Sequence, residues 1–316
     1  MDPRLFIARS VSAEAAVILR TVGEVLASLP PREPPASLAD FDAAKARGEA
    51  FAQQLTAGPL AALSPDLEPW TAGGTPVLTV RPRSKIENAA PLVYVHGGGF
   101  VGGSAQANLL TAALAADTTG RVVHSVDYTL APRAQWRQVI GEVTNAWKAI
   151  LGRSSHIPGL IGDSAGGCIA AAASLALRDQ GAPTPAALVL LSPVVDFSRG
   201  GDTNETLAPY DYLEARLLEP GLRAYADPSD WDEPLVSPIR ADFTPGFPPT
   251  LLQVGTREVL LSDSVRLHRA LRAAGRASRL EVYEGMPHVF QPMLAQTPEG
   301  RAAWREIADF WTEHLA

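Results

Sequence analysis

The 316-residue sequence contains one cysteine, Cys168. A single thiol excludes an internal disulfide and any zinc site built on pairs of cysteines. No run of about 18 apolar residues occurs, so we expect no transmembrane segment. The first residues, "MDPRLFIARS", lack the apolar stretch and cleavage site of a secretory signal, and we therefore expect a cytoplasmic protein.

The sequence also lacks any run of basic residues. Its 27 Lys and Arg against 34 Asp and Glu give a formal charge of −7, which is spread along the chain. Binding to a nucleic-acid backbone requires clustered positive charge, so we expect no nucleic-acid partner. With 46% hydrophobic and 19% charged residues, the composition is that of a soluble globular protein of one large or two smaller domains.

Short apolar runs rich in β-branched residues alternate with longer Ala- and Leu-rich segments from about residue 77 onward. This alternation predicts an α/β fold with a mainly parallel sheet flanked by helices. The predicted strands cover residues 77–81, 92–96, 122–127, 158–162, 186–191, 250–255 and 279–284.

Residues 196–240 interrupt this rhythm with aromatic residues, acidic residues and prolines but no clean strand, which indicates an insertion above the sheet. A proline-rich connector near residue 30 separates an N-terminal helical segment from the remainder of the chain. We interpret 1–55 and 196–240 as two parts of a lid or cap. Residues 56–195 and 241–316 then form the two parts of a catalytic core.

Ser164 lies in "GDSAG", a G-x-S-x-G motif that directly follows a predicted strand and precedes a predicted helix over 165–180. This is the context in which a sharp turn exposes a nucleophilic serine. Glycines two residues away on either side remove side-chain clashes from that turn. A helix-capping serine in a glycine-rich turn is the plainer alternative. Pro158 does not fit a central strand, so the strand is short or begins after it.

A serine hydroxyl needs a base, and the chain has six histidines. His288, in "EGMPHVF", follows the last predicted strand, which places it at the carboxyl edge of the sheet beside the serine turn. Three carboxylates are candidates to orient this base. We choose Glu258, after the strand over 250–255. Asp263, whose place at a helix start has a structural explanation, and Asp196 are the alternatives. The order Ser164, Glu258, His288 is that of an α/β-hydrolase.

The stretch "HGGGF", residues 96–100, follows a strand and lets backbone N–H groups approach a ligand closely. Together with the amide of Ala165, these groups are candidate donors to an oxyanion. A flexible connecting loop is the alternative interpretation. His96, Gly97 and Asp163, within the two motifs, are candidate supporting residues.

The motifs "YVHGGGFVGGS", "DYTLAP", "GDSAGG", "LLSPVVD" and "GMPHVF" resemble the hormone-sensitive-lipase-like branch of the α/β-hydrolases, mostly bacterial esterases. The likeness covers residues from about 75 to the C-terminus. It implies an α/β-hydrolase fold with a helical cap, Ser164 as nucleophile, His288 as base, and Gly98, Gly99 and Ala165 as oxyanion donors. His96 would shape the loop. The chain departs from the family pattern in its glutamate at the acid position and in Arg133, where glutamate is usual.

We therefore expect a serine carboxylesterase that acts on small, short-chain esters through an acyl-enzyme, without a metal or an organic cofactor. A lactone hydrolase, a deacetylase or an amidase with the same triad is the alternative. A small-molecule receptor that uses the same fold without catalysis is a further one. A homodimer through the last strand or the C-terminal helix is also a prediction.

Overall fold

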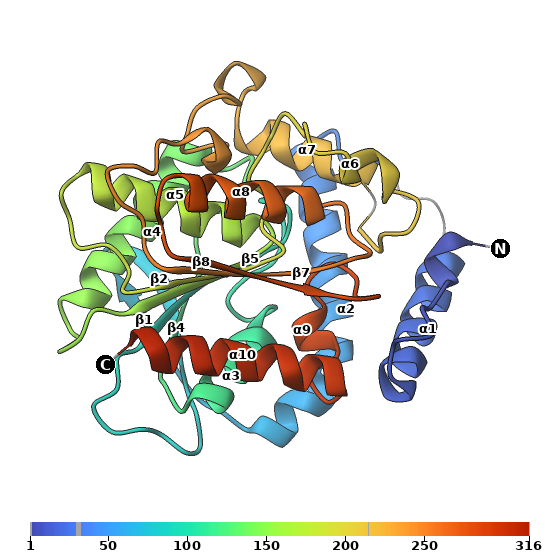
Figure 1. Cartoon of the computed structure of the whole chain (residues 1–316), viewed down its shortest axis with the longest axis horizontal. Helices are drawn as coiled ribbons and strands as arrows, with labels where there is room; N and C mark the ends of the chain where they lie inside the picture. Colours follow the sequence, from blue (N-terminus) through green and yellow to red (C-terminus); the bar gives the residue numbers. More distant parts are fainter. Residues whose placement is uncertain (1, 30–32, 214, 316) are drawn as a thin grey trace.

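The computed structural model describes residues 2–29, 33–213 and 215–315, so part of the expected proline-rich connector lies outside the described residues. Eight strands form one twisted sheet in the order β1-β2-β4-β3-β5-β6-β7-β8 (Figure 1). Strands β3 to β8 run parallel to one another, while β2 pairs antiparallel with both β1 and β4. The strands are β1 (Asp66–Ala72), β2 (Thr75–Arg81), β3 (Leu92–Val95), β4 (Val123–Val126), β5 (Gly159–Asp163), β6 (Leu188–Leu191), β7 (Thr250–Gly255) and β8 (Ser278–Tyr283).

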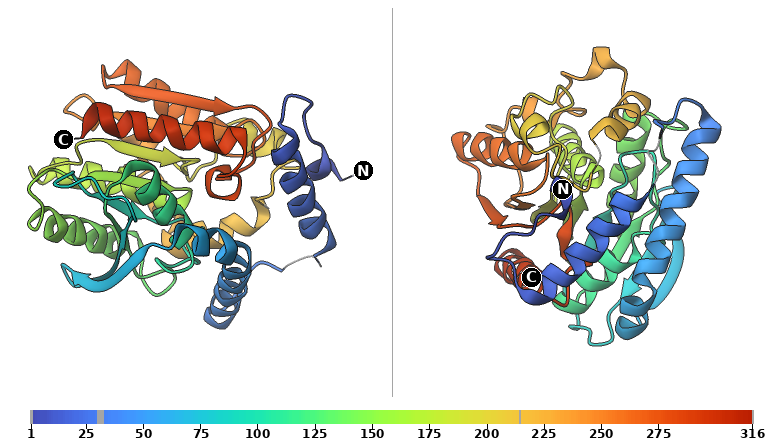
Figure 2. Two further views of the ribbon diagram at one scale, coloured as in Figure 1. Left: turned by 90° about the horizontal axis from the view of Figure 1, so that it is seen from below. Right: turned by 90° about the vertical axis from the view of Figure 1, so that its right-hand side faces the viewer.

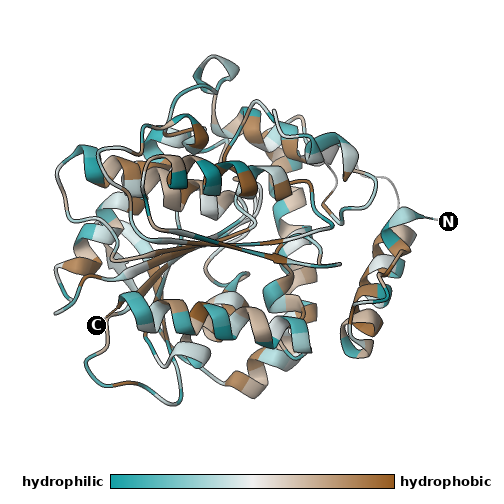
Figure 3. Cartoon of the chain, in the orientation of Figure 1, coloured by the Kyte–Doolittle hydropathy of each residue, from teal (hydrophilic) through white to brown (hydrophobic). Residues whose placement is uncertain are grey.

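Helices cover both faces of the sheet, α3 and α10 on one and α4, α5 and α8 on the other (Figure 1). Every residue of β3, β5, β6 and β7 is buried, as expected for strands that are covered on both sides. Figure 3 shows the apolar strands between helices of mixed polarity. These helices are α3 (Leu109–Thr119), α4 (Trp136–Leu151), α5 (Ala165–Asp179), α8 (Leu261–Ala273) and α10 (Pro298–His314), and α9 (Phe290–Met293) precedes the last of them.

All seven predicted strands are present, with small shifts at their ends, but the prediction missed β1. The sequence of β1, "DLEPWTA", contains two acids and a proline, and five of its first six residues are exposed. This strand is an edge strand, where a proline and charged side chains are tolerated because one side needs no ladder partner. Strand β5 begins at Gly159, so Pro158 lies just before it and removes no donor from the central ladder.

The N-terminal segment contains η1 (Pro3–Leu5), α1 (Ala13–Ser28) and α2 (Leu38–Leu63). Helix α1 lies at one side of the molecule (Figure 2). It is held at its start by Glu299 of α10, which accepts hydrogen bonds from the Ser12 amide and hydroxyl at 2.6 and 2.7 Å. Arg133, the departure from the family pattern, forms two hydrogen bonds of 2.6 and 2.8 Å to Asp42 of α2. This arginine therefore links the core to the N-terminal segment.

Residues 196–240 form the short elements α6 (Thr203–Thr206), α7 (Ala215–Tyr225), η2 (Pro228–Asp230) and η3 (Pro238–Arg240), with no strand in the described part of this stretch. Tyr212 donates a hydrogen bond of 2.7 Å to the carbonyl of Leu19 in α1, so the insertion and the N-terminal segment touch. The division into cap and core at the expected boundaries stays a prediction. Among the described helices, none is both long enough and apolar enough to cross a bilayer.

Candidate active site

Ser164 stands at the turn between β5 and α5 with φ of 54° and ψ of −120°. A side chain seldom adopts this conformation, so the turn carries strain that its surroundings must offset. The Ser164 amide donates to the carbonyl of Leu191 in β6 at 2.8 Å. A Cβ on Gly162 would meet the backbone of Gly166, and one on Gly166 would meet the backbone of Val95. The two glycines of the motif are therefore required by close backbone approach.

His288 lies between Ser164 and Glu258. Its Nε2 is 2.9 Å from Ser164 Oγ, and its Nδ1 is 2.9 Å from Glu258 Oε2. The loops that carry His288 and Glu258 follow β8 and β7, and a Cβ on Gly255 would meet the Met286 backbone where these loops touch. The three side chains chosen from the sequence are thus in one hydrogen-bonded line.

Glu258 is completely buried. Its Oε1 accepts hydrogen bonds from the Ser192 hydroxyl at 2.8 Å and from the Gly255 amide at 2.7 Å. Burial lowers the pKa of His288, but the hydrogen bond to Glu258 and the charge of that carboxylate outweigh it, so the pKa is raised above its ordinary value. The carboxylate therefore favours the protonated imidazole, the form that a general base adopts when it takes a proton.

The two alternative carboxylates have other partners. Asp263, in the first turn of α8, accepts hydrogen bonds from the amides of Val195 and Asp196 at 2.8 and 3.2 Å. Burial raises the pKa of Asp263 to about 7. Asp196 accepts from Ser198 at 2.5 Å and from Arg266 at 2.6 Å. Among the described residues, neither carboxylate forms a hydrogen bond to His288, so of the three candidates only Glu258 contacts this histidine.

The glycine loop after β3 lies against the serine turn. The Gly97 amide donates to Asp163 Oδ1 at 3.1 Å and is therefore occupied. The amides of Gly98 and Gly99 have no acceptor within the described ranges, and the Ala165 amide, first in α5, has no intrahelical one. Gly98 and Gly99 have φ of 126° and 61°, which glycine tolerates best. Three N–H groups are thus left available beside Ser164.

Asp163 connects the glycine loop to the serine turn. Besides the Gly97 amide it accepts the Tyr94 hydroxyl at 2.5 Å. Burial raises the pKa of Asp163, and these hydrogen bonds oppose the rise. His96 is also buried, stacks on Tyr128 at 4.4 Å between ring centroids, and lies with Nδ1 2.8 Å from the Gly97 carbonyl. These contacts fix the shape of the loop rather than reach the serine hydroxyl.

The sequence reasoning missed two residues that support this arrangement. The Ser192 hydroxyl, just after β6, donates to Glu258 and accepts from the Val289 amide at 3.2 Å. Asp211, from the insertion, accepts from the Val259 amide at 2.7 Å, next to Glu258, and burial raises its pKa to about 6. The position of Ser192 at the end of a central strand was the one available signal. Nothing in the sequence around Asp211 indicates its partner.

A small cavity of about 20 Å³ opens beside Ser164. This volume is close to the space that one water molecule requires. The cavity is mostly apolar and lies between the glycine loop, the serine turn and the insertion. Its lining residues besides Ser164 are Gly99, Phe100, Val194, Leu218, Leu222 and Leu260, together with the polar residues Asp196, Arg199 and Asn204.

Comparison with known proteins agrees with this geometry. Residues 92–292 match the family described as the alpha/beta hydrolase fold. An esterase of Acinetobacter venetianus is 34% identical over 226 residues, which are 70% of this chain and 74% of the relative. An acetyl-hydrolase of Streptomyces hygroscopicus is 34% identical over 237 residues, 74% of this chain and 78% of the relative.

A solved structure of an esterase from the bacterial hormone-sensitive lipase family superposes with a TM-score of 0.85 at 30% identity, over 96% of this chain and 98% of that one. The match therefore extends beyond the motifs to the whole arrangement of sheet, helices and insertion. The chain belongs to the α/β-hydrolase family, on its hormone-sensitive-lipase-like branch of esterases.

Proposed function

We propose that this carboxylic ester hydrolase uses Ser164 as its nucleophile, His288 as its general base and Glu258 as the orienting acid. The esterase and acetyl-hydrolase relatives support ester hydrolysis. The observation that carries the assignment of residues is the pair of 2.9 Å contacts that His288 makes to Ser164 and Glu258. Both distances are within the reach expected of a nucleophile, its base and its orienting group.

In the first step His288 Nε2 accepts the proton of Ser164 Oγ while the oxygen attacks the ester carbonyl. Glu258 holds Nδ1 as the protonated nitrogen, so Nε2 carries the lone pair at the start of the step, and it stabilises the imidazolium that forms. The imidazolium then donates its proton to the leaving alcohol. In the second half, water attacks the acyl-enzyme with His288 again as base, which releases the acid and regenerates Ser164.

The tetrahedral intermediate carries a negative oxygen, which the amides of Gly98, Gly99 and Ala165 would stabilise. Their lack of acceptors among the described residues supports this role, since an occupied donor such as Gly97 N–H would contribute nothing. Removal of one such donor costs about 3 to 4 kcal/mol of transition-state stabilisation in comparable enzymes. The N-terminus of α5 adds a favourable dipole at the same place.

The substrates that fit best are esters with short acyl chains. The cavity beside Ser164 has about 20 Å³, and Phe100, Leu218 and Leu222 are among its lining residues. So small a cavity favours a short acyl group over a long one. The name of the acetyl-hydrolase relative supports an acetyl group as the acyl part of the substrate. A homodimer stays a prediction, for which the unpaired outer edge of β8 offers a surface and light scattering a test.

The test is hydrolysis of p-nitrophenyl acetate and p-nitrophenyl octanoate by the wild-type protein and by Ser164→Ala. We expect the wild type to prefer acetate and Ser164→Ala to lose activity by several orders of magnitude. Ser174→Ala is the matched control, because Ser174 is a buried serine of α5 whose hydroxyl bonds, among the described residues, only to the Ala170 carbonyl at 2.8 Å. Equal activity of Ser164→Ala and wild type would refute the assignment.

A further inference from the structure

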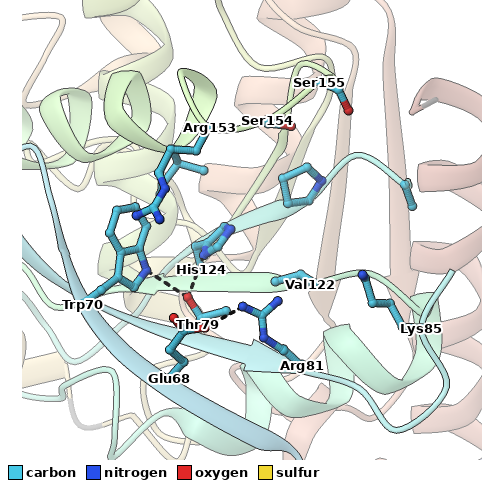
Figure 4. A pocket seen from close by; sticks show the side chains of 13 residues that line it. Glu68, Trp70, Thr79, Arg81, Lys85, Val122, His124, Arg153, Ser154 and Ser155 are labelled. Carbon is cyan, nitrogen blue, oxygen red and sulfur yellow. Dashed lines mark hydrogen bonds and ion pairs between the residues drawn. The ribbon is translucent and has the colours of Figure 1, made fainter. Parts of the chain in front are cut away.

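A second and larger cavity, of about 280 Å³, lies away from Ser164. Pro91 and Val122, which line it, directly precede β3 and β4, so it stands at the amino ends of these strands. Ser164 and His288 follow the carboxyl ends of parallel strands, at the opposite edge of the sheet. The other lining residues are Glu68, Trp70, Thr79, Arg81, Lys85, Ala89, His124, Ile150, Arg153, Ser154 and Ser155 (Figure 4).

The charged groups around this cavity are predominantly positive. It is lined by the cations Arg81, Lys85 and Arg153 and by one carboxylate, Glu68, in a chain whose formal charge is −7. Glu68 is paired with Arg81 at 2.6 Å. Lys85 lies 3.4 Å from Glu87, an exposed residue outside the lining, so the excess of positive charge rests mainly on Arg153, which has no ion pair among the described residues. Such a local excess in a concave site attracts anions.

His124 presents an unused N–H group to the same cavity. The Trp70 indole donates to Thr79 Oγ1 at 2.9 Å, and Thr79 Oγ1 lies 3.0 Å from His124 Nδ1 (Figure 4). Thr79 is buried, and no other acceptor for its hydroxyl proton is found in the described parts of the chain. The hydroxyl therefore donates to Nδ1, which leaves the proton of the neutral ring on Nε2.

The Nε2–H group of His124 has no hydrogen-bond partner among the described residues. Burial, together with the charges of Arg81 and Arg153, lowers the pKa of His124 to about 4. At neutral pH the ring is thus an uncharged donor. An anion bound in the cavity would satisfy this donor without requiring the ring to ionise.

Arg153 supplies the second unused donor group. Its guanidinium lies over the Trp70 ring, 4.5 Å from the centroid, and forms no ion pair or hydrogen bond with the part of the chain that the structure describes. The stacking holds the group in place, which reduces the entropy lost when it binds a ligand. Arg153 follows the C-terminus of α4, whose negative end would repel anions. That effect is reduced because the Ile150 and Leu151 carbonyls accept the Arg153 and Ser154 amides.

We propose that this cavity is a second binding site, which takes a small organic anion through a carboxylate or phosphate group. The oxyanion accepts hydrogen bonds from the Arg153 guanidinium and from His124 Nε2–H. The cavity volume of about 280 Å³ lies near the lower end of the range found for small-molecule pockets, so it suits a small organic ligand. The site does not depend on the ester chemistry at Ser164, and either proposal can fail without the other.

The test is calorimetric titration of the full-length protein at low ionic strength with two probes, inorganic phosphate and succinate. We expect saturable binding of at least one probe with one site per chain. Arg153→Gln should weaken it about tenfold, the effect of losing one charge-assisted hydrogen bond. Arg137→Gln is the matched control, since Arg137 also stacks on a tryptophan, Trp136 at 3.9 Å, but does not line this cavity.

Binding of phosphate alone would identify a phosphate-bearing ligand, and binding of succinate alone a carboxylate. Absence of saturation below about 10 mM for both probes would overturn the proposal. So would an equal affinity of Arg153→Gln and the wild type. If Arg153→Gln does not fold, as judged by lost ester hydrolysis, the same titration of His124→Phe tests the proposed site. This variant lacks the Nε2 donor and should also bind the probe about tenfold more weakly, and unchanged affinity would refute the site.

Discussion

Replacement of Glu258 by glutamine removes the charge beside His288 while keeping the size of the side chain. In the wild type, Oε1 of Glu258 accepts two hydrogen bonds, from Ser192 and Gly255, and Oε2 faces His288 Nδ1. In Glu258→Gln the amide oxygen must stay on the side of the two donors. The amide NH₂ group then faces Nδ1, which can no longer hold a proton there.

The consequence is a change of tautomer. With Nδ1 forced to accept a hydrogen bond, the proton of the neutral ring moves to Nε2, which then cannot take the proton of Ser164. We expect kcat/KM for p-nitrophenyl acetate to fall by about 10⁴-fold, the effect of the corresponding acid-to-amide change in a serine protease. Because the side chain keeps its size and two of its hydrogen bonds, the melting temperature should change little.

Asp263→Asn is the matched control. Asp263 Oδ2 accepts both of its backbone hydrogen bonds, and an asparagine oxygen at that position can accept them too. With a pKa raised by burial to about 7, this carboxyl already tolerates its neutral form near neutral pH. We expect its kcat/KM to stay within about tenfold of the wild type. A large loss in Asp263→Asn with a small one in Glu258→Gln would refute the choice of acid.

Three further predictions follow from the same geometry. The pKa of His288 is raised above its ordinary value, and the base must be neutral to accept a proton. We therefore expect kcat/KM to fall with decreasing pH through a midpoint above about 6.5, and a midpoint below about 6 would contradict this. Ser192→Ala removes the hydroxyl that bridges Glu258 and the Val289 amide, so kcat should drop about 10- to 100-fold in steady-state assays with the fold intact. An unchanged kcat would show that this bridge does not support catalysis. Leu222→Ala enlarges the cavity beside Ser164, so the ratio of butanoate to acetate hydrolysis should rise; an unchanged ratio would place the acyl chain elsewhere.

Elements with a strong local pattern could be predicted from the sequence. The buried parallel strands are short apolar runs with turns on both sides. The serine turn has its glycines because of close backbone contacts, within the turn for Gly162 and with β3 for Gly166. Strand β1 was missed because its edge position is set by pairing with β2, and its own residues favour exposure.

The site was predictable as far as chain order determines which loops meet at the carboxyl edge. The choice of Glu258 over Asp263 followed from the position of Asp263 at a helix start. In the structure Asp263 accepts hydrogen bonds from the amides of Val195 and Asp196, contacts with a distant segment that the sequence did not indicate. The contacts of Ser192 and Asp211 could not be predicted, because each joins segments far apart in the chain; only the position of Ser192 at the end of a central strand gave a signal. The cavity beside His124 likewise depends on β1, which the sequence did not reveal.

The most direct test of the central claim is covalent labelling with a fluorophosphonate, followed by intact-mass measurement and peptide mapping. If Ser164 is a nucleophile activated by His288, the wild type should gain one phosphonyl adduct, located in the peptide that contains Ser164. Its ester hydrolysis should disappear in parallel, and His288→Ala should react far more slowly. An adduct on another residue, or full ester hydrolysis by the completely labelled protein, would contradict the account.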